Sequence, residues 1–465
     1  MYVHSRVKAL FWAMVLGAMA AFSTPAFAVN DAMMDLLKIL RDKGSITAAE
    51  YEMLVNAAKA DSEHTTENTN QINTLKKSLP KITTKDKIVV ADEKGDFEWA
   101  FIGRVMADSI FTNDDETELE NGAELRRARL GVEATLWEHW IGKLEVDHDE
   151  DELSVKDAYV GYEDKWNDNK WWTKWGQQHV PFGFATLTSS KYMTFMNRPI
   201  FSDNEIEPAR QMGAAFFIAD GDKRWTAHTG VFTANLEEPT DCLAGAECDQ
   251  EFVVAGRVTG VPFMQDKTHL MHLGAGAYYK NPNGGTIDID QRDAVIHIID
   301  SKNLNADFTG IADDAFAWNV EAGGVWGPAH IMGQYASINV DRQPTGLDDV
   351  TLNAWYVDVG WFLTGESKNY DAGKGQWGSI KPKGIVGKGG IGAWEVAVRY
   401  EEADYTDGSF VGGEMDLLTV GINWYVNNTM RFMANYVDTL DYNENGSGDD
   451  NDEPSAFMLR GQIYW

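Results

Sequence analysis

The chain closes with Phe457-Met458-Leu459-Arg460-Gly461-Gln462-Ile463-Tyr464-Trp465. Counting back from Trp465, every second residue is apolar or small, and the residues between them include Arg460 and Gln462. This alternation predicts a strand with one apolar face and one wetter face. The chain stops inside the apolar pattern, on an aromatic residue, which is typical of the closing strand of a transmembrane β-barrel. We therefore expect the preceding chain to supply the barrel that this strand closes.

The first 28 residues have the pattern of a secretory signal peptide. Arg6 and Lys8 precede a short apolar run over 9–21, and Ala26-Phe27-Ala28 has the small-x-small spacing of a cleavage site. The apolar run is too short to span the ~30 Å hydrocarbon core of a bilayer, which argues against a membrane anchor. We expect export, with residues 1–28 removed and Val29 as the mature start.

The composition is aromatic without being apolar overall. The chain has 17 Trp, 16 Tyr and 21 Phe, yet its mean hydropathy is −0.35. A barrel gives such totals because only alternate strand residues face lipid and the loops are polar. An exported soluble β-protein could have the same totals, so the strand pattern has to decide between them.

The charge and the cysteines restrict the partners. The formal net charge of −32 excludes nucleic acid as a natural partner. Cys242 and Cys248 lie in one short stretch of an exported chain, which favours a local disulfide. Two sulfurs without a nearby histidine argue against a thiolate metal site, and we expect no cofactor.

Residues 29–79 have helical periodicity, with apolar residues three and four positions apart. Thr47 and Glu50 form a predicted capping box at the start of a second helix. Two interpretations stay open: a periplasmic helical or coiled-coil segment that aids trimerisation, and a mobile leader. Residues 80–96 are predicted to be a charged linker.

From Phe97 the apolar period becomes two, and residues 97–465 are predicted to form an all-β transmembrane antiparallel barrel of about sixteen strands. An even number places both barrel ends on the periplasmic side. The predicted strands are 97–111, 124–137, 140–148, 153–163, 170–179, 211–219, 224–234, 251–263, 268–280, 315–326, 329–341, 351–364, 391–404, 414–426, 430–441 and 455–465.

The connections alternate between short polar turns and longer acidic loops, as in outer-membrane barrels. The Gly- and Lys-rich stretch 367–390 breaks this rule, because the strand count places it on the short-turn side. Either this stretch is a periplasmic excursion or the strand count is wrong by one pair at this point.

Several stretches resemble the phosphate-selective porin O and P family of outer-membrane channels. They include 127–133 (RARLGVE), 156–162 (KDAYVGY), 189–192 (SSKY) and 421–428 (GINWYVNN). The resemblance covers most of the chain from Asp96 onward. It implies a homotrimer of sixteen-stranded barrels in the outer membrane, with the third long loop folded into the lumen. It also implies an anion preference created by Arg and Lys along the pore.

The basic positions that match this implied lining lie on strands and in the third-loop region, 180–210. Strand parity independently points five of them away from the lipid: Arg104, Arg127, Arg129, Arg257 and Arg399. His179 stands where we would expect family members to carry a lysine. The candidate pore-lining and anion-binding residues are Arg104, Arg127, Arg129, Lys191, Arg198, Arg210, Arg257 and Arg399.

A second interpretation is that these arginines only hold the barrel wall. Parity also places acidic residues inside, and ion pairs with them would cancel the positive lining. The acidic residues expected there are Glu98, Asp108, Glu133, Glu145, Asp157 and Glu395.

Metal and catalytic sites are weakly supported. Asp441, Asn443 and Asn445 resemble half of a calcium loop, but a solvated acidic outer loop is the favoured interpretation. The sequence has no Gly-x-Ser-x-Gly, His-Glu-x-x-His or phosphate-cradling glycine motif, so no enzyme is expected.

We therefore predict an outer-membrane porin that passes small hydrophilic solutes and favours inorganic anions such as phosphate. Its partners are expected to be further copies of the chain, outer-membrane lipids and the anions in transit. The alternatives are a weakly selective or cation-tolerant porin and, from another class, a structural or adhesive surface barrel.

Overall fold

The computed structural model describes residues 27–84, 87–113, 115, 119–149, 152–202, 206–234, 250–283, 287–292, 302–343, 346–443 and 453–465. The chain divides into two compact units, Met1–Pro80 and Lys81–Trp465. The predicted signal peptide lies outside the described residues, except for Phe27 and Ala28.

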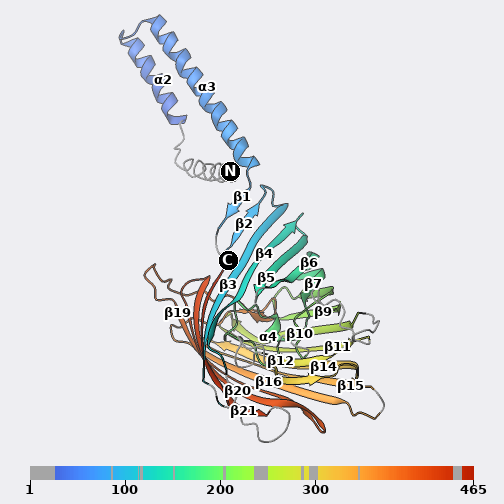
Figure 1. Ribbon diagram of the computed structural model, residues 1–465. Helices are drawn as coiled ribbons and strands as arrows, with labels where there is room; N and C mark the ends of the chain where they lie inside the picture. The colour runs from blue at the N-terminus through green and yellow to red at the C-terminus, as the bar shows by residue number, and fades with distance from the viewer. Residues whose placement is uncertain are drawn as a thin grey trace, which may run out of the picture. The chain divides into compact units, whose positions relative to one another are not determined.

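The first unit is a pair of helices, α2 (Phe27–Asp42) and α3 (Ala48–Ser78), drawn in blue in Figure 1. The predicted capping box is confirmed: Thr47 Oγ1 accepts from the Glu50 backbone N–H at 3.2 Å, and Glu50 accepts from the Thr47 N–H at 2.8 Å. Leu37 is buried, whereas Met33 and Leu75 are exposed. In the described part of the chain, no helix combines the length and apolarity needed to cross a membrane.

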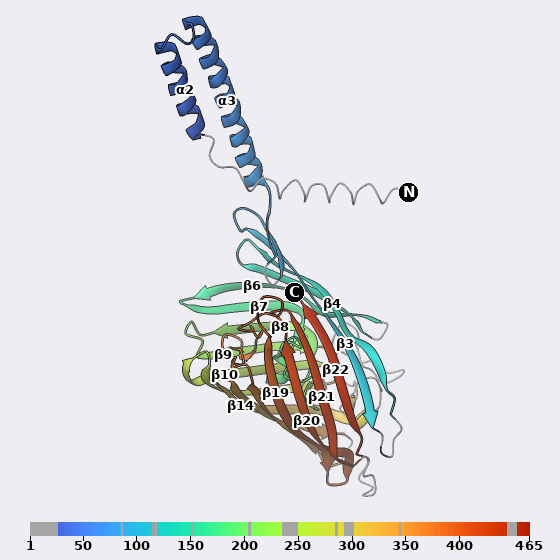
Figure 2. The same ribbon diagram turned by 90° about the vertical axis from the view of Figure 1, so that its left-hand side faces the viewer.

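The second unit is a closed antiparallel barrel of sixteen strands (Figures 1 and 2), so the predicted fold class is confirmed. Each predicted strand is present, with bounds that differ by a few residues. The strands are β3 (Phe97–Asn113), β4 (Gly122–Leu136), β5 (Trp140–Asp149), β6 (Glu152–Trp166), β7 (Asn169–His179), β8 (Arg210–Ala219), β9 (Trp225–Thr233), β10 (Phe252–Asp266), β11 (His269–Asn281), β14 (Ala312–Trp326), β15 (Ala329–Arg342), β16 (Val350–Phe362), β19 (Ala393–Asp407), β20 (Phe410–Tyr425), β21 (Met430–Asn443) and β22 (Ser455–Tyr464).

The closing strand has the two faces that its alternation predicts. Phe457, Leu459 and Ile463 are each about 40% exposed on the outer surface, whereas Arg460 and Gln462 are buried inside. β22 pairs with β3 over ten residues, from Ser455↔Asn113 to Tyr464↔Arg104. Apolar residues can face hydrocarbon while polar residues face the lumen only because the ladder is closed and leaves no free edge.

The two ends of the barrel differ, as in outer-membrane proteins. Short turns such as 137–139, 167–168 and 327–328 join strands at one end, where Trp137, Trp166 and Trp326 are exposed. Exposed tryptophans at such an end form the aromatic girdle of a membrane interface. Longer connections lie at the other end. One of them holds a hairpin of β12 (Asp288–Arg292) and β13 (Lys302–Asp307).

The stretch 80–96, predicted as a charged linker, contains two short strands that sequence reasoning missed. They are β1 (Lys81–Thr83) and β2 (Ile88–Ala91), and β2 pairs with residues 98–101 of β3. β22 ends at Tyr464, opposite Arg104, so the beginning of β3 would otherwise have a bare edge. β2 covers that edge, which explains why a polar stretch becomes extended there.

Candidate functional site in the barrel lumen

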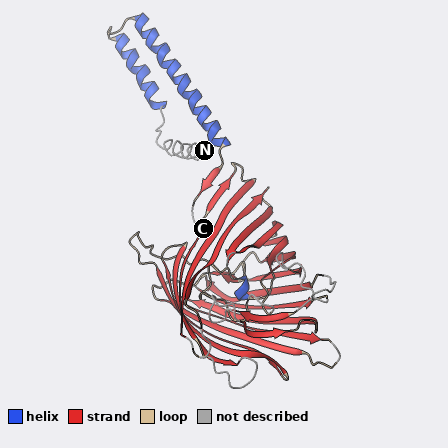
Figure 3. Ribbon diagram, viewed as in Figure 1, coloured by secondary structure: helices blue, strands red, loops and turns tan. Residues whose placement is uncertain are grey.

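Loop 3, defined as residues 180–202 and 206–209, folds into the barrel as predicted. Its short helix α4 (Phe184–Leu187) lies within the ring of strands in Figure 3. Phe182 and Phe195 are buried, although they belong to a connection. The Phe182 ring lies 5.2 Å from the Tyr278 ring, and Asn319 Nδ2 donates to the Phe182 carbonyl at 3.0 Å. Burial of these rings stabilises the inward conformation.

Inward side chains of the last strands hold the loop 3 backbone in place. Loop backbones need partners when they are buried, and charged side chains form the stronger hydrogen bonds. Three carbonyls accept from three different arginines: Met193 O from Arg431 at 2.6 Å, Met196 O from Arg460 at 2.7 Å, and Asn197 O from Arg399 at 3.1 Å. Loop 3 thus fills the side of the lumen next to β19–β22.

A second segment enters the lumen from the short-turn end. This inner segment, defined as residues 363–392, contains β17 (Tyr370–Asp371) and β18 (Gln376–Trp377). The Trp377 N–H donates to Thr188 Oγ1 of loop 3 at 3.4 Å, and the Trp377 and Phe184 rings lie 5.3 Å apart. The strand count was therefore right, and the unplaced stretch 367–390 is an excursion that turns inward.

A buried polar cluster around Glu395 anchors the inner segment. Glu395 of β19 accepts from Lys368 at 3.0 Å and from Tyr425 at 2.6 Å, and it lies 2.7 Å from His330 Nε2. Lys368 also donates to Thr194 of loop 3 at 2.9 Å. An ion pair without solvent access needs this many partners, because each buried charge loses its hydration.

The side of the lumen next to β5–β10 keeps a cavity of about 280 Å³, which we name the chamber. Its lining comes from six neighbouring strands, from α4 and from the inner segment. It includes four basic side chains and one carboxylate. The lining residues are Lys143, Asp157, Tyr159, Trp172, Lys174, Gln178, His179, Leu187, Phe217, Thr226, His228, Arg257, Lys374 and Gln376.

Lys174 is the chamber cation that no acid neutralises in the described part of the chain. Its ammonium lies 4.1 Å from the centre of the Trp172 ring and 4.4 Å from that of Tyr159. Trp172 stacks on Phe217, with ring centroids 5.2 Å apart and planes 12° apart. Cation–π contacts of this kind hold an ammonium without cancelling its charge.

Five of the predicted arginines have carboxylate partners inside the barrel, and their partners come from other strands. The pairs are Arg104 with Glu145 at 3.3 Å, Arg129 with Asp147 at 2.6 Å, Arg210 with Asp157 at 2.9 Å, Arg257 with Glu321 at 2.7 Å, and Arg399 with Asp358 at 2.6 Å.

The other three predicted basic residues have different surroundings. Arg127 lies inside the barrel, where its Nη1 contacts Met106 Sδ at 3.9 Å, and no carboxylate pairs with it among the described residues. Arg198 donates to the Ala185 carbonyl within loop 3. The Lys191 ammonium lies 5.6 Å from the Tyr464 ring centre.

Four of the acidic residues expected on the inner wall form buried ion pairs: Asp108, Glu145, Asp157 and Glu395. The partner of Asp108 is Arg460, which was not among the predicted residues. Glu98 is exposed, and Glu133 pairs with Lys87 at 3.3 Å near the surface.

Of the eight predicted basic residues, only Arg257 lines the chamber. Sequence reasoning missed Lys143, Lys174 and Lys374. Strand parity could have found Lys174. Trp171 and Trp175 lie on the outward face of β7, and Lys174 has the opposite parity, so it faces inward. Nothing local marks Lys374, which reaches the chamber only because the inner segment folds inward.

The other candidate sites are not assembled in the described part of the chain. Cys242, Cys248 and Asn445 lie outside the described residues. Asp441 and Asn443 lie at the end of β21. No group of three or more His, Cys, Asp or Glu that could hold a metal occurs among the residues that the structure describes.

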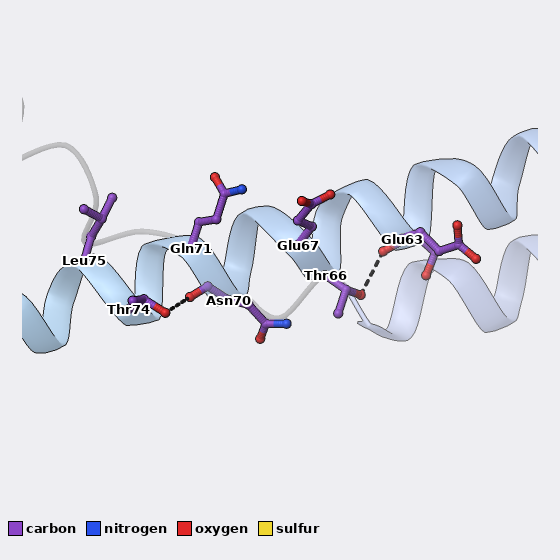
Figure 4. Close-up of a pocket in the computed structure, with 8 residues that line it drawn as sticks. Glu63, Thr66, Glu67, Asn70, Gln71, Thr74 and Leu75 are labelled. Carbon is purple, nitrogen blue, oxygen red and sulfur yellow. Dashed lines mark hydrogen bonds between the residues drawn. The ribbon is translucent and has the colours of Figure 1, made fainter.

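A hollow of about 730 Å³ lies along α3 (Figure 4). Its described lining residues all belong to that helix. Two of its threonines bond within the helix, Thr66 to the Ser62 carbonyl and Thr74 to the Asn70 carbonyl, each at 2.8 Å. Its lining contains no basic side chain, so we do not assign the hollow to the channel.

Comparison with known proteins agrees with this architecture. An uncharacterized protein of Caulobacter vibrioides is 28% identical over 333 residues, which cover 69% of this chain and 63% of that protein. The chain thus spans less than two thirds of the length of that relative. Porin O of Pseudomonas aeruginosa is 24% identical over 433 residues, 83% of this chain and 92% of Porin O.

A solved anion-selective porin from Comamonas acidovorans has a similar fold. It superposes with a TM-score of 0.50 at 13% identity and covers 79% of this chain and all of that chain. The profile of the family described as phosphate-selective porin O and P matches residues 101–465. The chain therefore belongs to this family and forms a β-barrel channel of the outer membrane.

Proposed function

We propose that this outer-membrane channel passes small hydrophilic solutes with a preference for anions. The observation that carries the proposal is the chamber lining, which contains four basic side chains and one carboxylate, and in which Lys174 has no acidic partner within the described part of the chain. Basic side chains that line a pore lower the entry barrier for anions.

The acidic total of the chain does not oppose this preference. The net charge of −32 is spread over the whole protein, much of it in connections. Water and salt screen such charges over ~8 Å at physiological ionic strength. Side chains inside a narrow lumen are screened far less, so the local balance of charge in the chamber decides selectivity.

Family membership supports the first two of three further proposals, and the sequence pattern supports the third. The transported anions include phosphate, in line with the description of the family. The chain assembles as a homotrimer in contact with outer-membrane lipids. Residues 1–28 act as a signal peptide, and 29–79 form a periplasmic helical segment.

The arginine pairing favours a second candidate function, a weakly selective porin. Arg104, Arg129, Arg210 and Arg399 each have a carboxylate partner, so their charges largely cancel. Under this candidate the chamber would be wide and hydrated enough for its lysines to have little effect.

The reversal potential in asymmetric potassium chloride separates the two candidates. The purified full-length protein is reconstituted into planar bilayers, and the potential at zero current is measured across a tenfold gradient. A potential of the sign for chloride preference is expected. A potential near zero would favour the weakly selective porin, and one of the opposite sign would reject the anion proposal. The absence of steady pores would favour the alternative function, a structural or adhesive surface barrel.

A further inference from the structure

We infer that the chamber is a binding site for organic monoanions that carry a planar apolar body, such as an aromatic carboxylate, and that it holds them more tightly than inorganic phosphate. This inference rests on the proposed anion preference and names the class of solute. Four features of the chamber carry it: an arginine that is already paired, an ammonium without an acidic partner, an unpartnered ring nitrogen and an apolar patch of wall.

The first feature is that Arg257, the arginine in the described chamber lining, already donates hydrogen bonds from its guanidinium group to another residue. Arg257 donates from Nε and Nη2 to the two carboxylate oxygens of Glu321, each at 2.7 Å, and from Nη2 to the Gly375 carbonyl at 2.7 Å. The planar fork of arginine is the group best matched to phosphate. In the chamber the Nε–Nη2 edge of that fork is occupied by Glu321.

The second feature is that the available charge is a single ammonium. Lys143 is bound to Asp157 at 2.7 Å, and Lys374 lies 3.7 Å from Asp371. Lys174 has ring contacts but no acidic partner among the described residues. One compact cation can balance one negative charge. Inorganic phosphate carries more than one negative charge at neutral pH. The additional negative charge would lose its hydration without gaining a cationic partner.

The third feature is a free hydrogen-bonding atom beside the same tryptophan. His228 Nε2 is buried, lines the chamber and has no hydrogen-bond partner in the described part of the chain. The His228 and Trp172 rings lie 5.0 Å apart. Lys174 and His228 therefore both contact Trp172. We infer that both donate to the oxygens of one carboxylate, with His228 carrying its proton on Nε2.

The rest of the wall suits an apolar body. Trp172, Tyr159, Phe217 and Leu187 supply aromatic and aliphatic surface between the donors. Small-molecule sites are mostly apolar, with a few polar groups that fix orientation, and begin at a volume of about 300 Å³. The chamber approaches this size, but its lining is as polar as it is apolar, and the apolar part is one patch formed by these four side chains. A hydrated inorganic ion gains nothing from such surface, whereas a planar ring does.

The test measures the block of chloride current by added solutes in bilayers that hold the full-length protein. Benzoate, acetate, inorganic phosphate and benzylammonium are the probes. We expect benzoate to halve the current at about a tenfold lower concentration than acetate, and at a lower concentration than phosphate. We expect benzylammonium, which has the ring with the opposite charge, not to block.

The variant Lys174→Met should raise the half-blocking concentration of benzoate at least about tenfold. The matched control is Lys170→Met on the same strand, because Lys170 is exposed and pairs with Glu163 at 2.9 Å outside the chamber lining. His228→Phe keeps the ring but removes the donor, and should weaken block by benzoate more than block by acetate.

The outcomes separate the two proposals. A channel that prefers potassium overturns the proposed function. A channel that prefers chloride but is blocked equally by benzoate and acetate, or more strongly by phosphate, overturns the organic-anion site alone. The wild-type comparison of the four solutes decides this point even if a variant fails to assemble.

Discussion

The backbone of Gly103 is bonded in both directions to Trp465, with Gly103 N–H to Trp465 O and Trp465 N–H to Gly103 O each at 3.1 Å. A Cβ on Gly103 would overlap the indole of Trp465 and would lie 2.9 Å from the Arg129 carbonyl. The last residue of the chain therefore closes the barrel against a position that is kept free of a side chain.

This closure predicts that Gly103→Ala impairs assembly. Overpacking at such a contact costs about 1–3 kcal/mol. The fraction of heat-modifiable protein in the outer membrane should fall, as it should for Trp465→Asp, which places a charge in the aromatic girdle. The control is Gly142→Ala, where a Cβ would meet its nearest neighbour, the Tyr159 carbonyl, at 3.7 Å. Normal assembly of the Gly103 variant would contradict this role.

The Lys368–Glu395 pair predicts a channel that opens wider when the pair is broken. Both side chains are fully buried, and removal of one partner leaves the other charge uncompensated, at about 3–5 kcal/mol. Lys368→Met should loosen the inner segment, raise single-channel conductance and lower the unfolding temperature.

The control for this pair is Lys381→Met, an exposed lysine of the same segment. The double variant Lys368→Met with Glu395→Gln should recover part of the lost stability, because neither charge then remains alone. Unchanged conductance in Lys368→Met would show that the inner segment does not narrow the pore.

Removal of Arg210 and removal of Asp157 should shift the selectivity in opposite directions. Arg210 and Lys143 both bind this carboxylate, at 2.9 and 2.7 Å, and Asp157 lines the chamber. Arg210→Ala removes one positive charge and should move the reversal potential toward cations. Asp157→Asn removes the chamber carboxylate and should move it toward anions. If both variants shift in the same direction, chamber charge does not set selectivity.

Lys191 predicts a dependence of selectivity on pH. Burial, together with the positive charges of Arg104 and Lys143, lowers the pKa of its ammonium, Glu145 and Glu133 partly oppose this, and the resulting pKa is about 8. The side chain is therefore charged below about pH 8 and becomes neutral above it. The anion preference should decrease between pH 7 and pH 9. This decrease should be smaller in Lys191→Met, and an identical decrease would assign it to other groups.

The sequence alone was sufficient for the barrel. Alternation of side chains along an extended chain is a local property of period two, so Phe457, Leu459 and Ile463 could be placed outside, and Arg460 inside, without knowledge of their neighbours. The same parity placed Arg104, Arg257 and Arg399 in the interior. The sixteen strands followed from such local patterns, whereas the inward loop 3 was expected from the resemblance to the porin family.

Only the tertiary structure decided which inward charges remain unneutralised. Arg257 pairs with Glu321, 64 residues away, and Arg460 with Asp108, 352 residues away. Such pairs depend on the register of strands that are distant in the chain. The inner segment likewise brings Lys374 to the chamber through contacts with loop 3 that no local pattern encodes. Parity determines the side on which a residue lies, but the partner it meets there depends on long-range packing.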